Sequence, residues 1–478
     1  MKVSRFSGVF TVGMILGVFL CVAAQSNSRP NILVILLDDS GYRDLGCFGS
    51  EIETPHIDRL AAEGMVFTDC HSAAPNCSPA RAGLLTGRIP IRCGIYSYLP
   101  EGHVMHLKEE EVTIAEMLKE EGYRTGHFGK WHLSRLNSEQ AQPTEQGFDY
   151  SFGTDNNAVP SHRNPKNFVR NGNLVGELEG YSCHLVVDEA VRWMKTGRGQ
   201  AEKSPFLACV WFHEPHSPIA SPDSLIVKYQ QRYPQYPKKR ATYYANIENV
   251  DLAVGKLLNT LKELGHDEDT FVFLTSDNGP VNAFSKGELR GRKSHVYEGG
   301  HRVPGIVRWP GQVEPGSRSK VPIGGVDLFP TIKEIVGSQI ASAGPVDGVS
   351  WLPLFKGKAL ERQTPLFWFF YRLNPAAAMR FGNYTLIGYS NDSEREKTHP
   401  LVNKDMPHIK NVSIEAIELF DLASDLPQTA NLYGETETHL ELGSRFESLL
   451  QEVVKEGENW EIPENYGAGS VKKRWLSK

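Results

Sequence analysis

The chain has 478 residues, of which 40% are hydrophobic and 23% are charged, and this composition is that of a folded globular protein. The length is too great for one small core, so we expect one large domain with a smaller one beside it. The formal net charge of −6 and the lack of a long basic run argue against a nucleic-acid partner.

The first residues have the order of a secretory signal peptide. Lys2 and Arg5 precede an apolar run over residues 9–22, which two alanines follow. We expect cleavage after Ala24, which removes residues 1–24. The alternative is an uncleaved anchor, because the apolar run is close to the minimum length that spans a bilayer. No later segment is apolar enough to span a membrane. We therefore expect a secreted, periplasmic or otherwise exported protein, lysosomal in a eukaryotic host.

From Asn31 onward, short apolar runs alternate with helical patterns, which indicates an α/β domain with a largely parallel sheet. The first predicted helix has Thr54 as its cap, Pro55 in its first turn and Gly64 as its stop. In chain order, we predict strands within 31–39, 65–70, 123–133, 205–216 and 269–279, and helices within 54–64, 113–122 and 245–265.

The pattern changes near residue 360. The segments 366–373, 378–390 and 417–422 are typical of antiparallel strands. We predict a catalytic domain over residues 25–360 and a smaller C-terminal α+β domain with an antiparallel sheet over 361–478, ending in a basic tail. The fold class is thus α/β, with a large, mostly parallel mixed sheet sandwiched by helices and this smaller domain attached.

Polar residues follow the carboxyl ends of the predicted strands, where open α/β sheets bind their ligands. Carboxylates and amide oxygens are hard ligands suited to Ca²⁺ or Mg²⁺, although acid pairs after strands are more often caps or solvated loop residues. The residues in question are Asp38 and Asp39, His132, His213 and His216, and Asp277 and Asn278.

Cys77 lies just ahead of a helical pattern. We predict Ser78 as the cap and Pro79 in the first turn, which places Cys77 at the positive end of the helix with Arg81 on the same face. Six cysteines follow the predicted signal peptide, and their spacings match no dense disulfide framework. From the residues alone, Cys77 can be a disulfide partner, a metal thiolate or the precursor of a modified nucleophile, and a buried or disulfide cysteine is the commonest case.

The stretch "CSPARAGLLTGR" resembles the signature of the type I sulfatases, a family of the alkaline phosphatase superfamily. In that family a dedicated maturation enzyme oxidises a cysteine in a C-x-P-x-R context to Cα-formylglycine. The continuation "RAGLLTGRIPIRCG" is similar to the branch of arylsulfatase A and N-acetylgalactosamine-6-sulfatase. Eight further segments resemble family landmarks in family order: "LLDDSGYRDLGCFGS", "GYRTGHFGKWHL", "HEPHSP", "LTSDNGP", "YEGGHRVPGIVRWPG", "VDLFPTIKEIVG", "DGVSWLPLFKG" and "ELFDLASDLPQTANLY".

The resemblance implies a set of site residues and cofactors. Cys77, as formylglycine, is the nucleophile, and the metal is Ca²⁺, although the ligand types alone leave Mg²⁺ possible. The implied metal ligands are Asp38, Asp39, Cys77, Asp277 and Asn278, and the other implied catalytic residues are Arg81, Lys130, His132, His216 and Lys293. Three residues near these motifs, which we expect to line the substrate pocket, are His213, His301 and Arg302.

The implied mechanism uses the two hydroxyls of hydrated formylglycine. One hydroxyl, deprotonated with the help of the metal, Arg81 and Lys130, attacks the sulfur of a sulfate ester. His216, with Lys293, protonates the departing alcohol, and the enzyme is left sulfated. His132 then takes the proton from the second hydroxyl, which expels sulfate and regenerates the aldehyde.

These features predict a sulfatase that acts on a sulfated sugar or polysaccharide fragment, because a polar site rich in histidine and arginine suits an anionic carbohydrate better than a steroid. One alternative is a phosphomonoester or phosphonate hydrolase of the same superfamily, which the C-x-P-x-R sequence disfavours. The other is a catalytically silent carbohydrate-binding relative, if Cys77 is not modified. Residues 152–172 depart most from the lysosomal relatives, so we expect substrate specificity to be encoded there.

Overall fold

The computed structural model describes residues 1, 29–136, 138–196, 204–391 and 401–463. The predicted signal peptide, apart from Met1, and the predicted basic tail lie outside the described residues. Among the helices of the described part, none is both long enough and apolar enough to cross a membrane.

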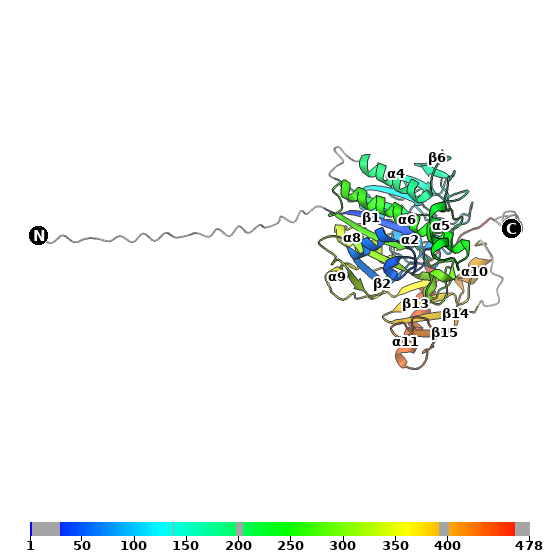
Figure 1. Cartoon of the computed structure of the whole chain (residues 1–478). Coiled ribbons are helices and arrows are strands. Elements are labelled where there is room, and N and C mark those ends of the chain that lie inside the picture. Colours follow the sequence, from blue (N-terminus) through cyan, green and yellow to red (C-terminus); the bar gives the residue numbers. More distant parts are fainter. Residues whose placement is uncertain (2–28, 137, 197–203, 392–400, 464–478) are drawn as a thin grey trace.

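A mixed sheet forms the centre of the molecule (Figure 1). Its strands, in the order in which they lie side by side, are β10 (Ser317–Ser319), β2 (Met65–His71), β9 (Arg302–Arg308), β8 (Thr270–Ser276), β1 (Asn31–Leu37), β7 (Phe206–Trp211), β3 (Arg124–Lys130), β4 (Tyr150–Thr154), β5 (Phe168–Arg170) and β6 (Asn173–Gly176), and β11 (Ile323–Gly324) pairs with β2.

The middle of this sheet is parallel and its margins are partly antiparallel. β8, β1, β7, β3 and β4 run parallel to one another. β9 runs antiparallel to both β2 and β8, and β5 runs antiparallel to β4 and β6. The prediction of a mostly parallel mixed sheet is confirmed.

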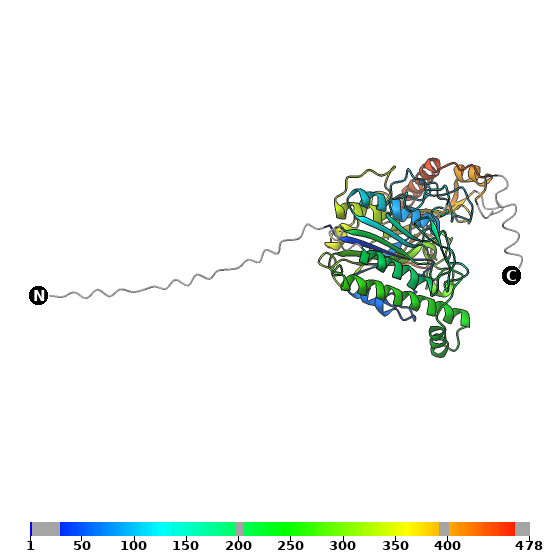
Figure 2. The same cartoon turned by 90° about the horizontal axis from the view of Figure 1, so that it is seen from above.

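Helices cover both faces of the sheet (Figure 2). β1 is apolar throughout because its side chains alternate between two cores: Ile32 and Val34 belong to one, and Leu33 and Ile35 to the other. The first core includes residues of α2 (Cys77–Thr86), α3 (Ile114–Glu120) and α8 (Leu328–Val336), and the second includes residues of α1 (Pro55–Ala62), α4 (Ser182–Thr196) and α6 (Lys238–Glu263). The remaining helical segments are η1 (Gly46–Phe48), α5 (Asp223–Arg232), η3 (Ala283–Ser285), α7 (Glu298–His301), η4 (Gly325–Asp327), α9 (Leu352–Phe355), α10 (Asp405–Lys410) and α11 (Glu437–Glu456).

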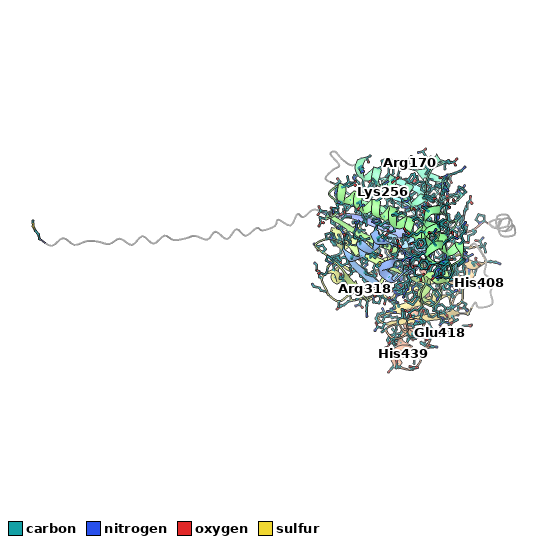
Figure 3. All side chains as sticks on the ribbon, viewed as in Figure 1. Arg170, Lys256, Arg318, His408, Glu418 and His439 are labelled. Carbon is teal, nitrogen blue, oxygen red and sulfur yellow. The ribbon has the colours of Figure 1, made fainter. Side chains whose placement is uncertain are left out.

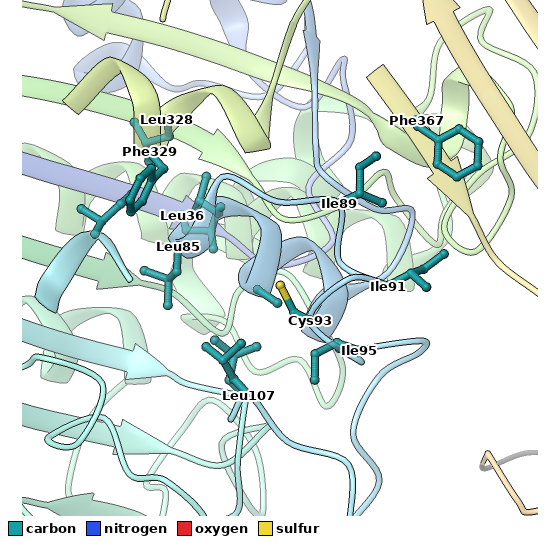
Figure 4. Close-up of a cluster of buried hydrophobic side chains, with 14 of the residues drawn as sticks. Leu36, Leu85, Ile89, Ile91, Cys93, Ile95, Leu107, Leu328, Phe329 and Phe367 are labelled. Carbon is teal, nitrogen blue, oxygen red and sulfur yellow. The ribbon is translucent and has the colours of Figure 1, made fainter. Parts of the chain in front are cut away.

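A second, antiparallel sheet lies to one side of the main body. It consists of β12 (Leu366–Phe369), β13 (Ala377–Phe381), β14 (Tyr384–Ser390) and β15 (Ile414–Asp421), in that order. Glu418 and His439 mark this end of the molecule in Figure 3, opposite Arg170 and Lys256. The first core continues toward it, since Phe367 belongs to the same apolar cluster as Leu85 of α2 (Figure 4).

The predicted helix boundaries were only partly right. α1 begins at Pro55, as predicted, but Thr54 makes no capping hydrogen bond, because its hydroxyl donates to Asp58 at 3.0 Å. α2 begins at Cys77 with Asn76 as its N-cap, so the prediction that Ser78 caps this helix is wrong. The Ser78 hydroxyl instead accepts a hydrogen bond from the backbone nitrogen of Leu99 at 2.9 Å. This bond ties the start of α2 to a distant loop.

A glycine in β3 permits close packing against β7. Gly129 has a φ of 110°, and a β-carbon there would lie 1.8 Å from the backbone oxygen of Trp211. We expect Gly129→Ala to lower the free energy of unfolding by roughly 2–4 kcal/mol, because it combines backbone strain with overpacking. Urea denaturation measures this change.

Gly122 provides the matched control, because its φ is 84° and a β-carbon there would meet nothing within 4 Å. Gly122→Ala should cost only about 1–2 kcal/mol, the penalty of the left-handed backbone alone. An equal loss of unfolding free energy in the two variants would show that the close approach of β3 to the backbone of Trp211 adds nothing to the cost of the substitution.

Candidate active site

Side chains from the carboxyl edge of the sheet and the start of α2 meet at one place. β8, β1, β7 and β3 lie side by side and parallel, so their carboxyl ends share an edge. The residues that this arrangement brings together are Asp38 and Asp39 after β1, Asp277 and Asn278 after β8, Lys130 at the end of β3, and Cys77 at the start of α2.

The oxygen atoms of this group fit a divalent cation. Asp38, Cys77 and Asp277 each offer one ligand atom, and these atoms lie within 4.8 Å of one another. One oxygen of Asp38 and the amide oxygen of Asn278 are buried and have no hydrogen-bond partner among the described residues. Buried polar atoms are almost always paired, and Ca²⁺ or Mg²⁺ binds such carboxylate and amide oxygens. The donor set therefore fits a hard metal ion.

Three cationic side chains surround these carboxylates. Arg81 donates to one oxygen of Asp277 through Nε at 3.0 Å and Nη2 at 2.7 Å. The Nζ atom of Lys130 lies 2.6 Å from Asp38, and that of Lys293 lies 2.6 Å from Asp39. The site therefore presents fixed positive groups to an anion that enters it.

Burial and neighbouring charges shift the pKa values of the two central carboxyls in opposite directions. Burial, reinforced by the charge of Asp38, raises the pKa of Asp277 to about 7. Burial also acts to raise the pKa of Asp38, but the charges of Lys130 and His216 hold it well below its usual range. A bound cation would favour the ionised form of both groups.

Two site residues adopt a strained backbone. Asp39 has a φ of 68° and His132 a φ of 56°, in the left-handed region that non-glycine residues seldom occupy. Ser294, next to Lys293, has a φ of 72°. Strain of this kind concentrates where a side chain must point in a required direction.

His132 is held so that one ring nitrogen is free to accept a proton. Its Nε2 lies 2.9 Å from the backbone oxygen of Leu99, which can only accept, so Nε2 carries the hydrogen. Its Nδ1 is buried without a partner among the described residues. Burial, together with the charge of Lys130, holds the pKa of His132 well below its usual value, so the ring is neutral and Nδ1 is a base.

Comparison with protein families decides the class of this site. A family model described as Sulfatase matches residues 30–338. The chain belongs to the sulfatase family. A second family model, described as N-sulphoglucosamine sulphohydrolase, C-terminal, matches residues 291–456. The sulfatase is accordingly a sulfuric ester hydrolase, and its family uses formylglycine and a divalent metal.

Individual relatives span most of the sulfatase. It is 35% identical over 393 residues to an N-acetylgalactosamine-6-sulfatase of Canis lupus familiaris, covering 76% of this chain and 72% of the relative. It is 31% identical over 418 residues to a steryl-sulfatase of Rattus norvegicus, covering 71% of this chain and 72% of the relative. A solved structure of Ps i-CgsB in complex with k-i-k-neocarrahexaose has a TM-score of 0.77 and 25% identity, covering 92% of this chain and 96% of that one.

His216 lies at the edge of the sulfatase site and keeps partial access to solvent. Its Nε2 is 3.5 Å from Asp39, and its side chain is 20% exposed. Its Nδ1 lies 2.6 Å from the backbone oxygen of Ser217 and therefore carries a hydrogen. Burial lowers the pKa of His216 to about 4. The ring is therefore neutral in the absence of a ligand. A ligand that brings negative charge next to Nε2 would favour its protonation.

Two further buried histidines adjoin the site, and the sequence singled out only one of them. Nε2 of His213 lies 2.8 Å from the hydroxyl of Thr154. His162 is 1% exposed, and its Nδ1 lies 3.4 Å from the side-chain nitrogen of Asn246 and 3.8 Å from Glu214. In each ring the other nitrogen is buried without a partner among the described residues. The sequence offered one indication of His162: it lies in the segment 152–172, which departs most from the lysosomal relatives.

We expect His162 to contribute to substrate binding, because a hydroxyl-rich ligand would satisfy such an unpartnered nitrogen. His162→Phe should lower kcat/KM for a sugar substrate about tenfold, mainly through KM. Steady-state kinetics and circular dichroism check activity and fold. His184→Phe, at a partly buried histidine that bonds Asn249, is the control, and an equal loss in both variants would contradict a specific role.

His301 and Arg302 are engaged by groups within the protein. His301 is fully buried, and its Nε2 lies 3.0 Å from the backbone oxygen of Val296. Arg302 donates to Glu298 at 3.1 Å and to the backbone oxygen of Thr68. Protein groups thus engage Nε2 of His301 and the guanidinium of Arg302, and the expectation that these two residues line the substrate pocket stays a prediction.

The cysteines form no disulfide within the described residues. Cys47, Cys70, Cys77, Cys93, Cys183 and Cys209 all carry free thiols, so the disulfide interpretation of Cys77 is wrong. Burial raises the pKa of the Cys77 thiol. An unmodified Cys77 would therefore be a poor thiolate nucleophile.

Proposed function

We propose that this sulfatase removes a sulfate ester from a sulfated sugar, with Cys77 matured to formylglycine and one Ca²⁺ bound beside it. The observation that carries the proposal is the convergence of Cys77 with the buried carboxylates of Asp38 and Asp277, within 4.8 Å. Thiol, hard oxygen ligands and fixed cations in one place suit the hydrolysis of an anionic ester.

The ligands proposed for Ca²⁺ are the side chains of Asp38, Asp39, Asp277 and Asn278 with the residue at position 77. When present, formylglycine supplies a hydrated aldehyde with two hydroxyls, and Ca²⁺ supplies positive charge that lowers the pKa of a bound hydroxyl. Arg81 holds Asp277 and the end of β3 in position. It donates to Asp277 through two nitrogens and to the backbone oxygen of Lys130 through a third.

Lys130 and Lys293 are placed to stabilise negative charge on the sulfate oxygens. Both ammonium groups already contact site carboxylates at 2.6 Å. We assign the transfer of a proton to the departing alcohol to Nε2 of His216, whose protonated form a bound sulfate favours. We assign the removal of a proton from the residue at position 77 to Nδ1 of His132. This nitrogen is buried and unpartnered among the described residues.

The proposed substrate class is a sulfated carbohydrate. The relatives named N-acetylgalactosamine-6-sulfatase, and the structure of Ps i-CgsB with k-i-k-neocarrahexaose, support it. The unpartnered nitrogens of His162 and His213 support it as well, since sugar hydroxyls can both donate and accept. The relative named steryl-sulfatase favours a steroid sulfate as the second candidate. Export of the protein is also proposed, because Lys2 and Arg5 precede the apolar run over residues 9–22, as in a signal peptide.

The experiment that tests the proposal has two parts. Mass spectrometry of the tryptic peptide that contains Cys77, on protein from its native host, should show formylglycine in place of cysteine. A panel of sulfated mono- and oligosaccharides, with a steroid sulfate and a phosphonate ester included, should show turnover of a sugar. Turnover of the steroid alone would overturn the sugar assignment. Turnover of the phosphonate alone would favour the hydrolase alternative, and unmodified Cys77 without turnover would favour the silent relative.

A further inference from the structure

A second group of potential metal ligands lies in the interior and uses none of the residues assigned to Ca²⁺. One ring nitrogen from each of His71 and His301 and one carboxylate oxygen of Glu298 lie within 4.8 Å of one another. The three residues are at most 1% exposed. His71 ends β2, whereas Glu298 and His301 are the first and last residues of α7.

The two histidines turn the same ring atom toward each other. Nδ1 of His71 lies 3.0 Å from Nδ1 of His301. Nε2 of His301 lies 3.0 Å from the backbone oxygen of Val296, so this nitrogen carries a hydrogen. Nε2 of His71 lies 2.6 Å from Asp69 and likewise donates to it. Burial opposes the ionisation of Asp69, but Arg302 and Arg380 hold its pKa below the usual value.

These bonds leave two lone pairs facing each other. A neutral imidazole whose Nε2 carries the hydrogen has an acceptor at Nδ1, so two such rings at 3.0 Å need a positive charge between them. That charge is either a shared proton or a metal ion. The outer nitrogens already have the partners that metal-binding histidines usually have, namely a carboxylate on His71 and a backbone carbonyl on His301.

Glu298 distinguishes a metal ion from a proton. Its Oε1 is buried and has no hydrogen-bond partner among the described residues, while Oε2 accepts from Arg302 at 3.1 Å. A proton shared by the rings would leave Oε1 unpaired, at the usual cost of a buried polar atom. A metal ion would bind this oxygen as its third ligand.

The donor set and the charge balance point to a transition metal. Two imidazoles and a carboxylate match Zn²⁺ and similar ions, and differ from the all-oxygen sites that Ca²⁺ prefers. The carboxylates of Glu298 and Asp69 pair with Arg302 and Arg380, so binding would depend on the nitrogen donors and not on surplus negative charge. Zinc–nitrogen bonds of about 2.0–2.1 Å at a tetrahedral angle place the nitrogens ~3.4 Å apart, so the rings would separate by roughly 0.4 Å.

The position of this group gives it a structural role. The backbone nitrogen of Ser72, next to His71, donates to the backbone oxygen of His301 at 2.7 Å. The ring of Trp368 stacks on His301 with centroids 3.8 Å apart. The segment after His71 leads to Cys77, and the segment before Glu298 comes from Lys293.

We propose that His71, Glu298 and His301 form a structural site for a zinc-type ion, which joins the segments that carry Cys77 and Lys293 and supports them against the second sheet. The site is separate from the catalytic Ca²⁺ and goes beyond the proposed function.

The experiment uses the full chain saturated with Ca²⁺ and probed with Zn²⁺ alone. We expect one equivalent of zinc to remain after dialysis, measured by elemental analysis. His301→Phe keeps an aromatic ring against Trp368 but removes Nδ1, so it should lose this equivalent. His106→Phe, at a histidine outside the cluster, should retain it. Zinc retained in His301→Phe, or none in the wild type, would overturn the proposal.

A second measurement does not depend on a variant that folds. Crystals of the wild type grown with Zn²⁺ and excess Ca²⁺ should show an anomalous peak at the zinc edge between the two Nδ1 atoms and Glu298. Density for the paired rings with no peak would establish a shared proton in place of the ion.

Discussion

Cys77→Ser should abolish turnover while the protein stays folded. The serine hydroxyl replaces a buried thiol at the first position of α2, so little repacking is needed. Serine can attack a sulfate ester once, but it lacks the second hydroxyl needed to expel sulfate. We expect kcat to fall at least about 10⁴-fold, as when other catalytic nucleophiles are removed. Peptide mass spectrometry after incubation with substrate should detect a sulfated serine.

Cys93→Ser provides the matched control. Cys93 is also buried, and its sulfur lies 3.5 Å from the hydroxyl of Thr86, so serine can keep this contact. The control should retain the wild-type kcat. Persistent turnover in Cys77→Ser, with the fold intact by circular dichroism, would refute the requirement for a residue with two hydroxyls.

Asp277→Asn should remove the metal ion and most of the activity. Asp277 is 2% exposed, lies among the proposed ligands and accepts two hydrogen bonds from Arg81. The amide has nearly the same shape but lacks the negative charge that attracts a cation and balances Arg81. We expect loss of the bound Ca²⁺ by elemental analysis and a decrease in kcat of at least about 100-fold.

Asp251→Asn tests whether any buried carboxylate would behave in this way. Asp251 is fully buried and accepts hydrogen bonds from the backbone nitrogens of His56 and Ile57, far from the proposed ligands in sequence. This variant should keep both Ca²⁺ and activity, with at most reduced stability. Calcium retained in Asp277→Asn would show that the proposed ligand set is incorrect.

The fold could be predicted from the sequence because its determinants are local. β1 reads as a continuous apolar run because both of its faces are buried, and Thr113 with Glu116 forms a capping box at the start of α3. Where a distant partner competes, the local prediction failed. Ser78 has the residue type of a helix cap, but its hydroxyl accepts a hydrogen bond from the backbone nitrogen of Leu99 instead.

The candidate site was predictable in part for a similar reason. The acids and Lys130 lie at strand ends within recognisable motifs, so their meeting at one edge follows from parallel strands, whereas Lys293 comes from the loop between η3 and α7. His162 carries no such motif, and its position depends on Asn246 and Glu214, which are distant in sequence. His301 and Arg302 lie within a recognised motif, yet the fold turns them toward Val296 and Glu298.

The sequence by itself determined the family, the cysteine that we propose is modified and the alternation of strands and helices, because these depend on residue types at short spacing. The tertiary structure decided which nitrogen of His132 is free, where His162 lies, and that His71 faces His301 across 230 positions of sequence. Those properties arise from contacts between segments far apart in the chain, and no local pattern encodes such contacts.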